Sequence, residues 1–128
     1  MTRNIAFVMY TSIIGEGFRD KFEGDKDYTT ILTTQYKDAE LYLNGMVPDV
    51  VVVEVPSHSA YPLSHCLSIC ERFKKINSNC KAMLFITYTY LEDIFPEIIE
   101  AKRQGQIDGF MSANNKVEEV IAGIKALT

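Results

Sequence analysis

An acidic residue at the end of a buried strand is the first feature of this sequence that suggests chemistry. Four consecutive valines, residues 50–53, precede Glu54 and lie between Pro48 and Pro56. β-Branched side chains in so short a run predict a strand that is buried on both faces, as in the middle of a parallel sheet. Functional groups gather at the carboxyl ends of the strands in such sheets, so Glu54 is the first candidate site residue.

The three cysteines, Cys66, Cys70 and Cys80, have neither the spacing of a metal finger nor that of a CxxC pair. Cys66 and Cys70 are four residues apart, which places them on one face of a helix. We interpret all three as small buried residues of a protein in a reducing compartment. A redox pair, or a metal site that includes His65, is the alternative, and the sequence offers no further partner for either.

The size and charge of the chain restrict the class of protein. Its 128 residues, 47% hydrophobic and 23% charged, are typical of one globular domain spanning residues 1–128. A net charge of −4 argues against direct contact with nucleic acid. No apolar run approaches the roughly 20 residues that span a bilayer, and the first strand follows the amino terminus without a signal peptide. We therefore expect a cytoplasmic protein.

Strand patterns alternate with helical patterns along the whole chain. Strands are expected at residues 5–9, 28–33, 49–55, 82–87 and 107–111. Helices are expected at residues 14–22, 39–43, 63–75 and 117–127, and a further helix is expected after Asp93, with Pro96 in its first turn. Asn44-Gly45 should end the short segment from 39 to 43, and Asn115 with Glu118 should form a capping box before the last helix. Five βα units with short connections predict an α/β/α sandwich around a parallel sheet, with flavodoxin-like strand order 2-1-3-4-5.

Within this class the chain resembles a response-regulator receiver (CheY-like) domain over essentially its whole length. The resemblance depends on Pro48-Asp49 opening the central strand, an acid six residues after that proline, Thr87 closing the fourth strand, and Asp108-Gly109-Phe110 in the fifth. In receivers, an aspartate after strand three accepts a phosphoryl group and an acidic pair after strand one binds Mg²⁺. A hydroxyl residue after strand four and a lysine after strand five bind the phosphoryl oxygens.

The sequence departs from that pattern at most of the chemical positions. The phosphoacceptor position holds Glu54, the acidic pair falls on Met9 and Tyr10, and the lysine position falls on Ala113. Mg²⁺ prefers oxygen ligands, which methionine and tyrosine do not supply in this arrangement. Phosphoryl transfer also depends on neutralising the charge of the transferred group. The resemblance therefore implies an atypical receiver that does not undergo ordinary phosphorylation.

Thr87 matches the family pattern, and Phe110 stands at the position of the switching aromatic residue. Tyr88 follows Thr87 where receivers usually have a small residue, and it could cover the pocket or join a contact surface. Glu54 either hydrogen-bonds Thr87 and holds the phosphorylated shape, or caps nearby backbone N–H groups or points into solvent. His58, in the next loop, could pair with Glu54 or lie exposed.

We therefore expect a non-enzymatic domain of two-component (phosphorelay) signalling that acts through protein contacts, without a cofactor or metal. Its partner is another protein or a second copy of the chain, and it contacts neither a membrane nor nucleic acid. The resemblance places the contact face on the last two helices and the fifth strand, with Glu97, Lys102, Arg103, Lys116 and Glu119 exposed. The alternative is a flavodoxin-like protein that binds FMN or another phosphorylated ligand at the loop formed by residues 10–17.

Overall fold

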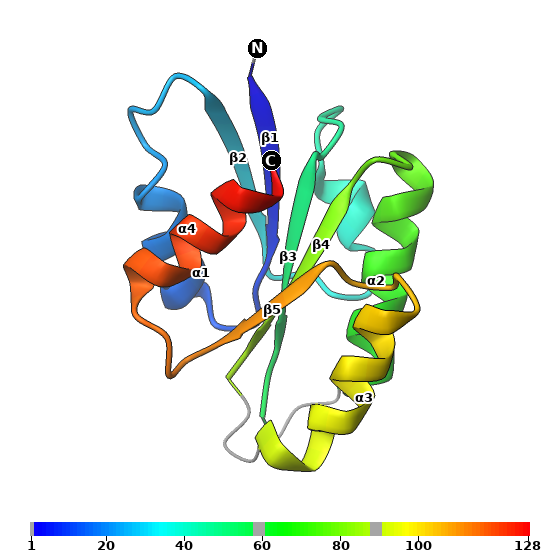
Figure 1. The fold of residues 1–128 in the computed structure, drawn as a ribbon. Helices are drawn as coiled ribbons and strands as arrows, with labels where there is room; N and C mark the ends of the chain where they lie inside the picture. The colour runs from blue at the N-terminus through cyan, green and yellow to red at the C-terminus, as the bar shows by residue number, and fades with distance from the viewer. Residues whose placement is uncertain (1, 58–60, 88–90) are drawn as a thin grey trace.

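One parallel sheet of five strands forms the middle of the molecule (Figure 1). The computed structural model describes residues 2–57, 61–87 and 91–128. The strands are β1 (Arg3–Val8), β2 (Tyr28–Thr33), β3 (Val50–Val55), β4 (Lys81–Ile86) and β5 (Gly109–Ser112). Their order is β2-β1-β3-β4-β5, and every neighbouring pair is parallel. This confirms the predicted α/β class and the flavodoxin-like strand order.

Helices cover both faces of the sheet. The helices α1 (Ser12–Asp20) and α4 (Val117–Leu127) lie on one face, and α2 (Leu63–Ile76) and α3 (Leu91–Arg103) lie on the other (Figure 1). A 3₁₀ turn, η1 (Ala39–Tyr42), packs beside α2. Each layer encloses its own cluster of buried apolar side chains against the sheet.

The valine strand β3 is central because both of its faces are buried. It lies between β1 and β4, and all six of its residues are buried. Successive side chains of a strand point to opposite faces. Val51 and Val53 accordingly pack under α2, whereas Val50 and Val52 pack under α1 and α4. The end of β3 is thereby fixed relative to both helical layers.

The second helix of the predicted series is a single 3₁₀ turn. Of its apolar residues only Ala39 and Leu43 are buried, which is too little apolar surface to hold a longer helix. Asn44 and Gly45 end it, as predicted, with positive φ angles of 53° and 81°. The protein thus has four α-helices rather than five among the described residues.

The starts of α3 and β5 and the cap of α4 differ from the prediction, whereas α4 spans residues 117–127 as predicted. Helix α3 begins at Leu91, so Asp93 lies in its first turn instead of capping it, and Pro96 lies inside the helix. The acidic first turn stabilises this earlier start through the helix dipole. Strand β5 begins at Gly109, two residues later than expected.

The helix α4 is capped one residue later than the predicted box. The Lys116 N–H donates to Glu119 Oε1 at 2.8 Å, so Glu119 has the role that was expected of Glu118. Asn115 does not cap the helix, because its Oδ1 accepts the Ser112 N–H at 3.0 Å and closes the preceding turn.

Both ends of the chain lie at the edge of the sheet where the strands β1, β2 and β3 begin (Figure 1). Arg3 pairs with Tyr28 in neighbouring strands, and the Tyr28 hydroxyl lies 3.2 Å from Thr128 Oγ1. The described helices are all too short or too polar to span a membrane.

Candidate functional site

Glu54 lies at the carboxyl end of β3 and is completely buried. Its exposed fraction is 0%, and it is the only charged side chain in the core of the described residues. A carboxyl group removed from water requires hydrogen-bond donors to offset the lost hydration. Two threonines, one on each side of β3, supply these donors.

Thr11, between β1 and α1, makes two hydrogen bonds to Glu54. Its N–H donates to Oε1 at 2.8 Å, and its hydroxyl donates to Oε2 at 2.8 Å. Thr11 is the N-cap residue of α1, and its carbonyl accepts the N–H groups of Ile14 and Gly15. Glu54 therefore satisfies a donor at the helix N-terminus, where the helix dipole favours a negative charge.

Thr87, directly after β4, makes the third hydrogen bond to the carboxyl group. Its hydroxyl lies 3.0 Å from Glu54 Oε2 and 3.2 Å from the carbonyl oxygen of Val55. The sequence suggested the contact between Thr87 and Glu54, and the structure contains it. The suggestion that Glu54 points into solvent is wrong, because the side chain has no exposed surface.

Met9 and Tyr10 occupy the positions of the acidic pair, and neither side chain offers a carboxylate. Met9 is completely buried. Its Cγ would lie 2.9 Å from a Cβ atom at Gly15, so α1 and the end of β1 are in close contact. Tyr10 is 51% exposed. The described residues contain no cluster of three carboxylate, histidine or cysteine side chains that could bind a metal ion.

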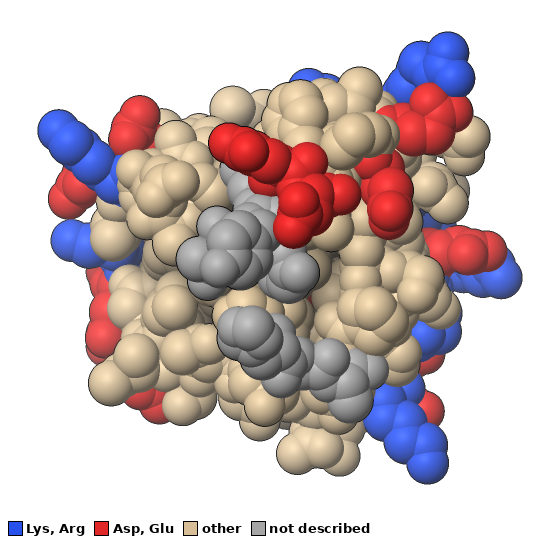
Figure 2. Space-filling view, turned by 90° about the horizontal axis from the view of Figure 1, so that it is seen from below, with Lys and Arg blue, Asp and Glu red and all other residues tan. Residues whose placement is uncertain are grey.

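The position at which receivers have a lysine for binding the phosphoryl group holds Ala113, which has no positive charge. Ala113 is exposed, and its N–H donates to the carbonyl oxygen of Ile86 at 3.1 Å, so the residue continues the pairing of β4 and β5. Figure 2 looks onto this edge of the sheet and shows acidic side chains near its centre and basic side chains around its margin. The visible surface at this edge therefore does not favour an approaching phosphate.

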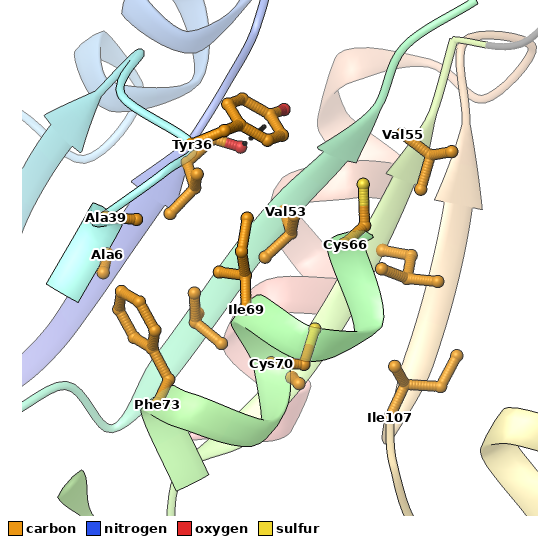
Figure 3. Close-up of a cluster of buried hydrophobic side chains, with 14 of the residues drawn as sticks. Ala6, Tyr36, Ala39, Val53, Val55, Cys66, Ile69, Cys70, Phe73 and Ile107 are labelled. Carbon is orange, nitrogen blue, oxygen red and sulfur yellow. Dashed lines mark hydrogen bonds between the residues drawn. The ribbon is translucent and has the colours of Figure 1, made fainter. Parts of the chain in front are cut away.

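Tyr36 is a site residue that sequence reasoning missed. Its hydroxyl donates to the carbonyl oxygen of Glu54 at 2.6 Å, lies 3.3 Å from that of Val8, and accepts the Tyr10 N–H at 3.0 Å. Burial, followed by the charges of Cys66 and Glu54, raises the pKa of Tyr36 far above its usual value. The neutral hydroxyl therefore joins the ends of β1 and β3, at the end of the apolar cluster nearest the site (Figure 3).

The ring of Tyr36 stacks on that of Tyr61, with ring centroids 4.6 Å apart. Tyr10 contacts both rings edge-on, at 6.4 Å and 6.1 Å. Tyr36 lies in a polar stretch between Gln35 and Lys37, without the periodicity that would have marked it as buried. No sequence signal therefore distinguishes it from an ordinary loop residue.

The cysteines are buried, as predicted, and form no disulfide. The Cys66 thiol donates to the carbonyl oxygen of Glu54 at 3.6 Å. Burial and the nearby charge of Glu54 raise the pKa of Cys66 to about 12, and burial is the main reason that the pKa values of Cys70 and Cys80 rise to about 12 and about 11. These thiols stay protonated at neutral pH, which makes them poor nucleophiles.

The loop that would hold a flavin phosphate has a different structure from the one predicted. Only Tyr10 and Thr11 precede the helix, because α1 already begins at Ser12. The Thr11 N–H that an anion would use is bonded to Glu54. Absence of flavin absorbance in the purified protein remains the test of this alternative. The predictions about Tyr88 with its neighbours 89–90, and about His58, concern positions outside the described residues.

The predicted contact face is formed by α3, β5 and α4, and its expected charged residues are exposed: Glu97, Lys102, Arg103, Lys116 and Glu119. Phe110 of β5 is half-buried, and its ring meets that of Phe95 edge-on at 5.8 Å between centroids. Phe95 and Ile99 of α3 are 42% and 43% exposed. Sequence reasoning did not assign these two apolar residues to the surface.

The sequence matches no protein-family model and no curated protein. The fold is similar to that of a response regulator from Thermotoga maritima (TM-score 0.76, 14% identity, 99% of this chain and 98% of the other). It is also similar to a CheY-like receiver domain from Methanospirillum hungatei JF-1 (TM-score 0.72, 14% identity, covering 98% of this chain and 93% of the other). A third similar structure is described as an adenylate cyclase from Rhodopirellula baltica (TM-score 0.77, 14% identity, covering 99% of this chain and 87% of the other). At these identities the similarity establishes a receiver-like fold.

Proposed function

We propose that this chain is an atypical receiver-like domain of two-component signalling that works through protein contacts and not through phosphoryl transfer. It acts in the cytoplasm as a non-enzymatic domain. Its switch elements are held by Glu54 without a phosphoryl group, and its contact surface is the face formed by α3, β5 and α4. The receiver-like fold over nearly the whole chain supports the signalling class.

The observation that carries this proposal is the complete use of the Glu54 carboxyl group inside the protein. Oε1 accepts the Thr11 N–H, and Oε2 accepts the hydroxyls of Thr11 and Thr87. In the receivers that this chain resembles, the hydroxyl of the residue after β4 binds a phosphoryl oxygen. Here that hydroxyl already has a negatively charged partner, so the contact that phosphorylation would create is supplied by the side chain itself.

The residues at the positions of the receiver's acidic pair and lysine support the same conclusion. Phosphoryl transfer needs positive charge around the transferred group, usually from Mg²⁺ and a basic side chain. Met9, Tyr10 and Ala113 supply neither metal ligands nor a cation. A phosphoryl group attached to Glu54 would also have to displace three hydrogen bonds in a buried site.

Incubation with acetyl phosphate and Mg²⁺, followed by intact mass spectrometry, tests the proposal. We expect no phosphoryl adduct on the wild-type protein. The Glu54→Gln variant is the matched control, because it keeps the shape of the side chain and removes the acid. An adduct that hydroxylamine removes, and that is absent from Glu54→Gln, would overturn the proposal.

A further inference from the structure

The strand β2 forms one edge of the sheet and pairs with β1 alone among the described strands. The carbonyl oxygen of Thr33, at the end of β2, accepts the Met9 N–H at 3.0 Å. Backbone groups of successive residues alternate in direction along a strand, so the backbone groups of Thr30 and Leu32 point away from β1. Within the described part of the chain, neither of these two N–H groups has a hydrogen-bond partner.

The edge of β2 is also open to another chain. Its six residues include no charged residue, no proline and no glycine. Natural sheets use lysines, prolines, bulges or a covering segment to keep an edge strand from pairing with another chain. Thr29 is exposed, and a hollow of about 600 Å³ lies beside Tyr28 and Thr30 at the end of α1. The strand thus offers free pairing groups without the residues that usually prevent pairing.

We propose that β2 pairs with β2 of a second copy of this chain, antiparallel about a twofold axis at Thr30, so that the two sheets continue as one. The Thr30 N–H of each copy then donates to the Thr30 carbonyl oxygen of the other, and the Leu32 N–H donates to that of Tyr28. No existing bond is broken, because the Tyr28 N–H already donates to the carbonyl oxygen of Asp25 at 3.2 Å. Such a closed, isologous pair needs no further copy.

The side chains that this register brings together explain why a second copy is the occupant. On the α1 face, Leu32 of each copy lies opposite Tyr28 of the other, and both residues already pack against the buried cluster of that face. Thr30 lies opposite Thr30, and on the other face Ile31 lies opposite Thr29. Apolar and Thr–Thr pairs across antiparallel strands are stabilising, and no like charges are opposed. The reversed strand therefore complements both the backbone groups and the side chains of β2.

This surface is separate from the contact face formed by α3, β5 and α4. The strand β2 lies at the edge of the sheet opposite β5 and shares no residue with that face. Pairing through β2 leaves the face free for another protein, and it makes no use of Glu54. The inference therefore goes beyond the proposed function, and either proposal can fail without the other.

Charges placed at Thr30 give the most specific test, because the twofold axis brings this residue opposite its own copy. We expect the wild-type protein to form dimers in sedimentation-velocity runs over a concentration series. Thr30→Lys and Thr30→Asp each oppose like charges, so each variant alone should associate roughly tenfold more weakly or worse. An equimolar mixture of the two should recover dimers. The control variants Asn114→Lys and Asn114→Asp change an exposed residue beyond β5 and should dimerise as the wild type does.

Cross-linking through Thr30→Cys tests the register of the pair. Residues directly opposite in antiparallel strands have Cα atoms about 5.5 Å apart, which a disulfide can span. With oxidised glutathione as the oxidant, Thr30→Cys should form a covalent dimer, whereas Asn114→Cys should not. The three native cysteines are buried and should not contribute.

Circular dichroism confirms that each variant is folded. A wild-type protein that stays monomeric at every concentration would leave the edge to an extended segment of another protein and would overturn the proposal. A mixture of Thr30→Lys with Thr30→Asp that fails to pair would also overturn it, as would equal cross-linking of Thr30→Cys and Asn114→Cys.

Discussion

Replacement of Glu54 tests whether its buried carboxyl group stabilises the protein or is tolerated at a cost. Glu54→Ala removes the acceptor of three hydrogen bonds. The Thr87 hydroxyl can donate instead to the carbonyl oxygen of Val55, 3.2 Å away, and the Thr11 hydroxyl can rotate. The Thr11 N–H cannot move in this way, so it is left without its partner at the start of α1.

The expected loss of stability follows from these contacts. An unsatisfied buried donor costs about 1–3 kcal/mol, and truncation of a buried side chain adds a cavity. The release of a buried charge offsets part of this loss. We expect Glu54→Ala to lower the free energy of unfolding by about 3 kcal/mol, and Glu54→Gln, which keeps an acceptor for Thr11, by about 1 kcal/mol. In a domain of this size, about 3 kcal/mol corresponds to a decrease of roughly 12 °C in Tm.

Urea denaturation followed by circular dichroism gives these differences, and hydrogen exchange locates them. The amides of Thr11, Ile14 and Gly15 should exchange faster in Glu54→Ala than in the wild type, because the first turn of α1 has lost its anchor. Thr87→Val is a milder comparison and should cost about 1 kcal/mol. An alanine variant as stable as the wild type, with unchanged exchange at α1, would refute this reasoning and show that desolvation outweighs the hydrogen bonds.

Two further predictions concern the groups around the site. Tyr36→Phe should cost about 2 kcal/mol in urea denaturation, because it leaves the Tyr10 N–H unpaired and leaves the carbonyl oxygen of Glu54 with only the weak thiol donor of Cys66. Tyr10→Phe, at an exposed ring, should cost under about 0.5 kcal/mol, and equal effects of the two substitutions would contradict the role of the Tyr36 hydroxyl. The free energy of unfolding should fall as the pH rises above about 9, because the cysteine thiols ionise in the unfolded chain while burial keeps Cys66 and Cys70 protonated in the folded protein up to about pH 12. Each such thiol contributes a slope of up to about 1.4 kcal/mol per pH unit, and a Cys70→Ala variant with an unchanged slope would contradict this account.

The central strand could be predicted from the sequence because burial on two faces leaves a clear pattern, and the strand order followed from the match of five βα units to the flavodoxin-like topology. The valine run of β3 has no other reasonable interpretation, and its position at the centre of the sheet followed from it. The helix boundaries were less accurate, since a cap depends on individual hydrogen bonds. Glu119 takes the place expected of Glu118 because Asn115 is used in a turn, and nothing in the order of residues decides between them.

The candidate site was predictable only in part. The position of Glu54 at a strand end followed from the valine run that precedes it, and its contact with Thr87 was one of the alternatives that the resemblance to receivers suggested. The complete burial of Glu54 did not follow, because the donors come from Thr11, which was expected to lie inside a loop and is instead the N-cap residue of α1. The part played by Tyr36 depends on how the chain after β2 folds back over the sheet, and no local pattern encodes that path.

The proximity of the two chain ends has a practical consequence. Arg3 pairs with Tyr28, and the Tyr28 hydroxyl reaches Thr128, so a short flexible peptide could join the amino and carboxyl termini. New termini could then be opened at Gly105, an exposed left-handed turn position between α3 and β5. Such a circular permutant would keep every strand pair while changing which segments are synthesised first.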